Sequence, residues 1–148
     1  KQLDDLSKSS SKAVRASAMF TRAALAIQQN DQKTAVSTYK SIADDSSFPD
    51  AYRNAALIRQ TALEFDQLQP QDVIARLQPL TKAGDPWFGS AGEMTALALI
   101  KQGKNQEAGQ LFAAIAKDKN VPGSIRNRAI QISGTLGVDS SAALPLAQ

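Results

Sequence analysis

The chain has 148 residues, enough for one domain with a sizeable core, and 43% of them are hydrophobic while 21% are charged. It contains neither cysteine nor histidine, which excludes thiolate chemistry, imidazole acid–base catalysis and the usual zinc or haem ligands. The net charge is only +3 and the basic residues form no dense run, which argues against nucleic acid as a partner. No apolar run reaches the roughly 18 residues that a membrane span needs.

The first elements in chain order are predicted to be helices. Residues 1–10 are expected to be the frayed remainder of a helix, before a single helical domain over residues 11–136. Residues 12–29 are apolar almost all round, which is typical of a helix buried between neighbours. A turn at Asn30 then leads into a second helix, about residues 32–44, whose apolar residues Ala35, Tyr39 and Ile42 follow a helical spacing.

The same pattern returns later in the chain. Residues 18–49 align with residues 91–122 at a constant offset and without a gap. The matched pairs include Ala23 with Ala96, Ile27 with Ile100, Asn30 with Gly103, Ala35 with Ala108, Tyr39 with Phe112, Ile42 with Ile115, and Pro49 with Pro122. Pro86 falls midway between the two prolines, so the unit recurs about every 36 residues. Such a period is typical of stacked helix pairs.

The middle copy is less regular. A first helix is predicted over residues 50–68, with Ala62 among its core residues. A second helix opens at Pro70 and is ended or kinked by Pro79. Proline is tolerated at the first position of a helix, so Pro49, Pro86 and Pro122 are expected to start the next first helices.

The C-terminal part of the chain is predicted to close the array. The segment that begins at Pro122 fits an amphipathic capping helix with Ile125, Ala129 and Ile132 on one face. Residues 137–148 have no periodicity and are expected to be a loose tail.

The repeat resembles the tetratricopeptide repeat (TPR). The small residue of the first helix falls on Ala23 or Ala96, and the turn residue on Asn30 or Gly103. The second helix has its small residue at Ala35 or Ala108 and an aromatic residue at Tyr39 or Phe112. The early tryptophan and mid-helix tyrosine of that family are missing, and the closing prolines come about two residues late, so the match is divergent. The resemblance implies an all-α, right-handed superhelix of about three antiparallel helix pairs plus a C-terminal capping helix.

Three segments make the resemblance narrower: "GDPWFGSAGEMTALA", "GKNQEAGQLFAAIAKD" and "VPGSIRNRAIQI". Over about residues 11–136 the chain is similar to the ancillary Sec-translocon subunit family of bacteria, whose TPR-like domain is periplasmic and tethered to the inner membrane by one N-terminal anchor. The resemblance implies a protein that assists secreted or envelope proteins at the translocon together with periplasmic chaperones. The anchor would lie outside this chain.

Several residues invite a sharper chemical interpretation. Trp87 with Phe88 could form an aromatic platform for a ligand, but packing against the preceding unit, with Asp85 as a helix cap, is the favoured interpretation. Ser37 and Lys40 spell S-x-x-K, yet the other motifs of a serine acylase are absent, so Ser37 is expected to face solvent. The aspartates at the ends of second helices, Asp44, Asp45 and Asp118, are interpreted as solvated turn residues rather than metal ligands.

The sequence therefore predicts a non-enzymatic protein-interaction module that uses no cofactor or metal. The partner-binding concave face is predicted at Phe20, Ile27, Glu93, Ile100 and Lys101, with Glu93 either facing the groove or paired with Arg59 or Lys101. The partners are expected to be translocon subunits, periplasmic chaperones or secreted chains. A cytosolic helical-repeat scaffold and a self-assembling structural domain, binding copies of itself, are the alternatives, and a small helical hydrolase is disfavoured.

Overall fold

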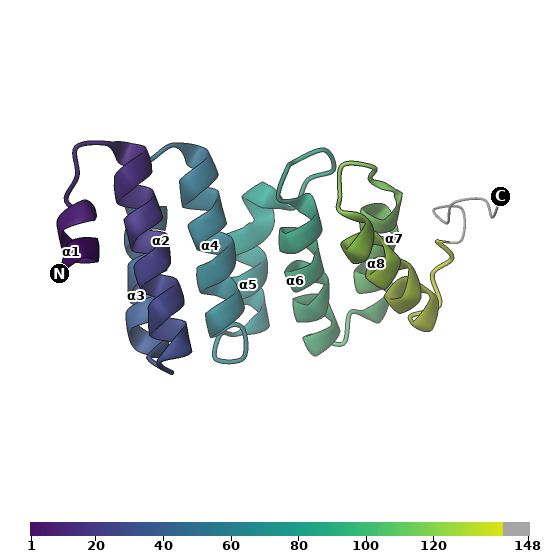
Figure 1. Ribbon diagram of the computed structural model, residues 1–148. Coiled ribbons are helices and arrows are strands. Elements are labelled where there is room, and N and C mark those ends of the chain that lie inside the picture. Colours follow the sequence, from purple (N-terminus) through teal and green to yellow (C-terminus); the bar gives the residue numbers. More distant parts are fainter. Residues whose placement is uncertain (141–148) are drawn as a thin grey trace. The chain divides into compact units, whose positions relative to one another are not determined.

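The computed structural model of the chain describes residues 1–140 and confirms the all-α prediction, because these residues contain eight α-helices and no strand (Figure 1). The contacts within the chain define two compact units, Lys1–Gln67 and a second unit that begins at Leu68. No helix within residues 1–140 has the length and apolarity needed to cross a lipid bilayer.

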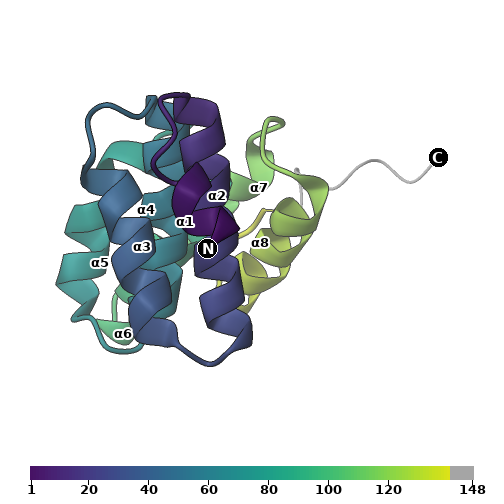
Figure 2. The ribbon, with the colours of Figure 1, turned by 60° about the vertical axis from the view of Figure 1, so that its left-hand side comes forward.

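The first unit carries the first copy of the repeat. It consists of α1 (Gln2–Leu6), α2 (Lys12–Gln28), α3 (Gln32–Asp44) and α4 (Asp50–Glu64). Helix α3 packs against both α2 and α4, and the three helices stand side by side in Figure 2. The side chains of Ser11 and Asp31 accept hydrogen bonds from the backbone N–H groups of Val14 and Thr34, so both α2 and α3 begin with an N-cap.

The second unit carries the second copy. It consists of α5 (Pro70–Leu77), a short 3₁₀ segment η1 (Gln78–Leu80), α6 (Phe88–Lys101), α7 (Asn105–Lys117) and α8 (Gly123–Thr135). Helix α7 packs against α6 and α8 as α3 packs against α2 and α4, and α5 packs against α6. The helix predicted after Pro122 is α8.

The turn inside each hairpin has the same backbone geometry in both units. Asn30 and Gly103 both lie in the left-handed region, with φ of 58° and 76°. The N–H groups of Asn30 and Asp31 donate to the carbonyls of Ile27 and Ala26, at 3.0 and 2.8 Å. The N–H groups of Gly103 and Lys104 make the equivalent bonds to Ile100 and Leu99, at 2.8 and 2.9 Å. This is the Schellman arrangement, which ends a helix and satisfies its last carbonyls.

The loop after each second helix is also repeated. Asp45 accepts a hydrogen bond from the N–H of Ser47 at 2.8 Å, and Asp118 accepts one from Asn120 at 2.9 Å. These side-chain turns reverse the chain. The next residue, Phe48 in the first unit and Val121 in the second, is buried. Pro49 and Pro122 come next and have an extended backbone conformation. They are the N-cap residues of α4 and α8, so neither is the first helical residue that the sequence predicted.

Each unit has its own core around the aromatic residue of its second helix. Tyr39 is buried with Ala16, Ala23, Ile42, Phe48 and Ala56. Phe112 is buried with Phe88, Ala96, Ala108, Ile115, Val121 and Ala129. Tyr39 and Phe112 are only 2% and 1% exposed. Burial of each aromatic side chain contributes about 1.5–3 kcal/mol of apolar transfer free energy. The two cores therefore stabilise the packing of the two helix hairpins.

Helix α2 is less buried than its composition predicts. Its buried residues are the alanines Ala16, Ala18, Ala23 and Ala26, whereas Ala13, Val14, Ala24, Leu25 and Ile27 are exposed. The prediction of all-round burial is therefore wrong. Within the first unit α2 packs mainly against α3 and the five-residue α1, and small alanines are the residues that these contacts bury.

The middle of the chain differs from the prediction in three details. Helix α4 ends at Glu64 rather than near residue 68, because Pro70 starts α5 and holds Gln69 in an extended conformation. Helix α5 ends at Leu77, as Pro79 predicts. Pro86 does not start the next helix, because it lies in a turn and α6 begins at Phe88. Ala62, predicted as core, is exposed.

The prediction of a loose tail is wrong for residues 137–140, the part of the tail that the structure describes. The N–H groups of Gly137 and Val138 close α8 with a third Schellman motif, donating to Gly134 and Ser133. Ser140 is buried and its hydroxyl shares a hydrogen bond of 2.5 Å with the hydroxyl of Ser133. The rest of the predicted tail, residues 141–148, lies outside the described residues.

Candidate functional site

The five residues predicted to bind a partner lie on the two first helices, at matching helical positions. Phe20 and Ile27 are on α2, and Glu93, Ile100 and Lys101 are on α6. Successive residues of an α-helix are rotated by about 100° around the helix axis. On α2 and on α6 the predicted residues fall within an arc of about 100°, so on each helix they share one face. Under the repeat offset, Phe20 is equivalent to Glu93 and Ile27 to Ile100. We call these two surfaces the α2 face and the α6 face.

The α2 face combines an aromatic ring, a cation and an exposed aliphatic side chain. Phe20 is half-buried and its ring centroid lies 5.8 Å from that of Tyr39. The guanidinium of Arg59, from α4, lies 5.2 Å from the centroid of the Phe20 ring. Ile27, about two helical turns further along α2, is 42% exposed. The first unit thus presents an isoleucine beside a ring that is already covered by a cation.

The α6 face is organised by an ion pair that the sequence did not predict. Glu93 takes hydrogen bonds from both Nε and Nη2 of Arg128, on α8, and the Nη2 bond is 2.7 Å long. These hydrogen bonds raise the pKa of the Arg128 guanidinium above its ordinary value. The predicted partners of Glu93, Arg59 and Lys101, are not the ones that hold it here.

The aliphatic side chain exposed on the α6 face is Leu97, which is 37% exposed. Ile100, the predicted residue, is instead partly buried against the core of the second unit. Lys101 is exposed at the end of the helix. Leu97 lies one helical turn after Glu93 on the same face, but the sequence alone does not show that Leu97 is exposed while Ile100 is partly buried.

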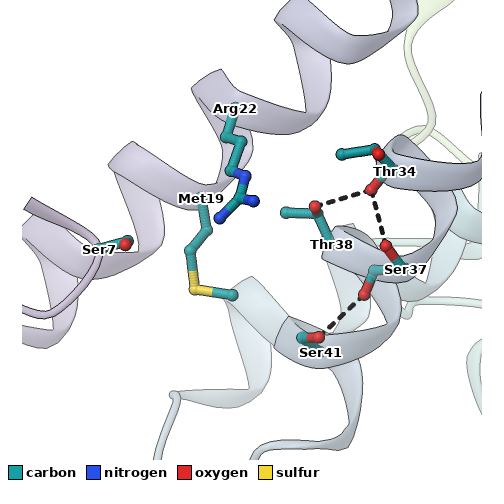
Figure 3. A pocket seen from close by; sticks show the side chains of 7 residues that line it. All are labelled: Ser7, Met19, Arg22, Thr34, Ser37, Thr38 and Ser41. Carbon is teal, nitrogen blue, oxygen red and sulfur yellow. Dashed lines mark hydrogen bonds between the residues drawn. The ribbon is translucent and has the colours of Figure 1, made fainter. Parts of the chain in front are cut away.

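A polar pocket of about 330 Å³ lies in the first unit, between α1, α2 and α3. Figure 3 shows Met19 and Arg22 of α2 pointing toward a row of hydroxyl groups on α3. One guanidinium nitrogen of Arg22 lies 3.6 Å from a carboxylate oxygen of Asp4. The lining residues are Ser7, Met19, Arg22, Thr34, Ser37, Thr38 and Ser41.

The hydroxyl groups of this pocket are engaged with the backbone. Thr38 and Ser37 donate to the carbonyl of Thr34, at 2.7 and 3.0 Å, and Ser41 donates to the carbonyl of Ser37 at 2.9 Å. Lys40, the other half of the S-x-x-K motif, pairs with Asp44. The hydroxyl proton of Ser37 is therefore directed at a backbone carbonyl and not at a side-chain base of the kind that activates a nucleophile.

The aspartates considered as metal ligands have structural partners. Asp45 accepts from Arg15 at 3.3 Å as well as from Ser47, and the Ser47 hydrogen bonds hold the pKa of Asp45 below its ordinary value. Asp118 accepts from the N–H of Gly84 at 2.9 Å as well as from Asn120. Within residues 1–140 no group of three or more acidic side chains is close enough to hold a metal ion.

The tryptophan segment contributes mainly to packing. Phe88 is buried in the core of the second unit, so it does not form an open platform with the half-buried Trp87. The carboxylate of Asp85 accepts a hydrogen bond from the N–H of Trp87 at 2.8 Å. A Cβ atom at Gly89 would lie 2.8 Å from Val121, and one at Gly92 would lie 2.9 Å from Ile115. Both glycines therefore permit close helix contacts.

Comparisons of the chain with protein families, with curated proteins and with solved structures found no match. The class that the observed geometry defines is an all-α protein built from a duplicated three-helix unit.

Proposed function

We propose that the chain is a non-enzymatic protein-interaction module that binds an apolar segment of a partner protein along its first helices. One observation carries the proposal: equivalent faces of α2 and α6 each expose a large aliphatic side chain, Ile27 and Leu97. These are two of the five exposed large hydrophobic residues within residues 1–140. Single exposed apolar residues are common on protein surfaces. An exposed aliphatic residue on the same face of the first helix in both units favours a binding function.

The chemistry of the two faces indicates the kind of segment that would bind. Completing the burial of one exposed aliphatic side chain contributes on the order of 1 kcal/mol, so two anchors supply modest affinity. The cation of Arg59 beside the α2 face would orient an acidic residue of the partner. On the α6 face Arg128 is already neutralised by Glu93, so we expect the apolar contact to dominate there.

The finer assignment rests on the resemblance to the ancillary Sec-translocon subunit family. We propose that the helix pairs continue as a TPR-like right-handed superhelix whose inner surface contains both faces. The matching turns and loops of the two units support a regular array of this kind. The same resemblance supports a periplasmic location at the inner membrane, with secreted or envelope proteins as partners of the module.

A peptide array tests the proposal. The full chain is incubated with immobilised overlapping 15-residue peptides from secreted proteins, and bound protein is detected with an antibody. We expect binding to peptides that combine aliphatic and acidic residues. The variants Ile27→Gln and Leu97→Gln remove the anchors without adding charge, and each should weaken binding to the same peptides. Ala114→Gln, at an exposed helical position on α7, is the control. Equal binding by all variants would refute the use of these faces.

A further inference from the structure

The segments that join each second helix to the next helix differ in charge between the two units. Residues 44–53, from the end of α3 into α4, carry three aspartates and one arginine, a net charge of −2. Residues 117–126, from the end of α7 into α8, carry two lysines, one arginine and one aspartate, a net charge of +2. We call these segments the α3–α4 corner and the α7–α8 corner. The two copies of the repeat thus present opposite charges at equivalent places.

The charges of the α3–α4 corner are matched within the first unit. Each of its aspartates forms an ion pair with a basic side chain. The pairs are Asp44 with Lys40, Asp45 with Arg15, and Asp50 with Arg53. Arg53 also donates from Nε to the carbonyl of Ala43, at 3.1 Å. The guanidinium of Arg53 is therefore bound both by a carboxylate and by the C-terminal end of α3.

The cations of the α7–α8 corner have no such partners. Lys117, Lys119 and Arg126 form no ion pair within residues 1–140. Asp118, the one acidic residue of this corner, accepts hydrogen bonds from two backbone N–H groups. Arg126 is half-buried, and its Nε is buried without a hydrogen-bond partner in the described part of the chain. Burial without a partner is unfavourable for a charged group.

The carboxylate that Arg126 lacks is missing at Gly123. Gly123 is the first residue of α8 as Asp50 is the first residue of α4, and Arg126 matches Arg53. The φ of Gly123 is not positive, and a Cβ atom built there would meet only Nη2 of Arg126, at 4.0 Å. Neither backbone strain nor crowding requires glycine at this position. The space beside the guanidinium, which a side chain could fill, is left open.

The position of Arg126 in its helix adds to the imbalance. Arg126 is the fourth residue of α8, and the positive end of the helix dipole disfavours a cation in the first turn. In α4 the acidic Asp50 offsets this effect for Arg53, whereas the first turn of α8 contains no acidic residue. An anion beside Arg126 therefore stabilises both the guanidinium and the helix end.

We propose that the α7–α8 corner binds an acidic segment of a partner protein. One carboxylate of that segment pairs with Arg126, in the way that Asp50 pairs with Arg53. A planar guanidinium suits a carboxylate, which can accept two of its N–H groups at once. Lys117 and Lys119 are exposed and attract further acidic residues of the same segment.

An anionic membrane surface is the competing occupant. Stable binding to anionic lipid typically uses clusters of about four to eight basic residues, and the corner carries three. The half-buried guanidinium also favours one defined carboxylate over a diffuse surface charge. The proposal does not depend on the α6 face, because Arg128 on that face is about 160° away from Arg126 around α8.

The test uses a fluorescent ten-residue peptide in which aspartate alternates with glycine. Its binding to the full chain is measured by anisotropy at low salt. We expect saturable binding with one peptide per chain, and weaker binding as salt is added. A matched peptide with asparagine in place of aspartate should not bind.

Two variants should each weaken binding of the aspartate peptide about tenfold, the loss expected for one charge-assisted hydrogen-bond pair. Arg126→Gln removes the guanidinium. Gly123→Asp supplies an internal carboxylate, as Asp50 does in α4, and blocks the site. Gly123→Asn has the same size without the charge, so it is the matched control and should bind more tightly than Gly123→Asp. Circular dichroism verifies that each variant is folded.

Three results would overturn the proposal. The first is absence of saturation at millimolar aspartate peptide. The second is unchanged affinity of Arg126→Gln, or equal affinity of Gly123→Asp and Gly123→Asn. The third is binding of the chain to phosphatidylglycerol vesicles that Arg126→Gln abolishes, without binding of the aspartate peptide, which would identify a membrane surface as the occupant.

Discussion

The duplicated hairpin turn leads to a prediction about Gly103. Its φ of 76° is unfavourable for any residue with a Cβ atom, while a Cβ built there meets no atom within 4 Å. The substitution Gly103→Ala therefore introduces backbone strain without a steric clash. Placing a non-glycine residue in the left-handed region costs about 1–2 kcal/mol, so the free energy of unfolding should fall by that amount.

The same chemical change elsewhere provides the control. Gly134 lies inside α8, has no positive φ, and a Cβ atom added to it would also meet no atom within 4 Å. Gly134→Ala should raise the free energy of unfolding by about 0.5–1 kcal/mol, because alanine favours the helix. Asn30→Gly, at the equivalent turn of the first unit, should stabilise as well, since Asn30 has a φ of 58°.

The measurement is urea unfolding followed by circular dichroism at the helix band. We expect Gly103→Ala to lower the free energy of unfolding and Gly134→Ala to raise it. Equal and favourable effects of both substitutions would show that the turn at Gly103 does not adopt the left-handed conformation in solution, and the equivalence of the two hairpins would lose its main support.

Three further predictions concern the core, the close of α8 and acid stability. Phe112→Ala removes a buried ring and should lower the free energy of unfolding by about 3–5 kcal/mol in urea titrations; a loss below about 1 kcal/mol would contradict its burial. Gly109→Ala places a Cβ atom 2.6 Å from Val138, so we expect a loss of about 1–3 kcal/mol that a second substitution, Val138→Ala, partly restores. The pKa of Asp45 is below its ordinary value of 3.8 in the folded chain, so its carboxylate stabilises the fold above that pH and the contribution is lost as the pH falls below it. Asp45→Asn should therefore lower stability at pH 6, and the difference from the original chain should shrink toward pH 3; a constant difference would refute this role.

The candidate site was only partly predictable from the sequence. Helical spacing placed Phe20 and Ile27 on one face of α2, and Glu93 and Lys101 on the equivalent face of α6. Whether such a side chain is exposed depends on which other helices approach it. Arg128 reaches Glu93 from a helix 35 residues further along the chain, and neither residue type nor local spacing specifies that pair. Leu97 was overlooked for the same reason.

Local chemistry in the sequence was sufficient to predict the helices, the hairpin turns and the repeat. Asn30 and Gly103 end helices because of their own backbone preferences, Pro70 and Pro79 delimit α5, and the spacing of Ala108, Phe112 and Ile115 selects the buried side of α7. These properties act over one or two helical turns, so the sequence alone reveals them. Leu25 is exposed whereas Ala98, its equivalent in the second copy, is buried, and only the tertiary structure determines this difference. Two equivalent positions on two similar helices differ there because α5 covers one and the shorter α1 leaves the other open, and burial is a property of neighbours rather than of the residue itself.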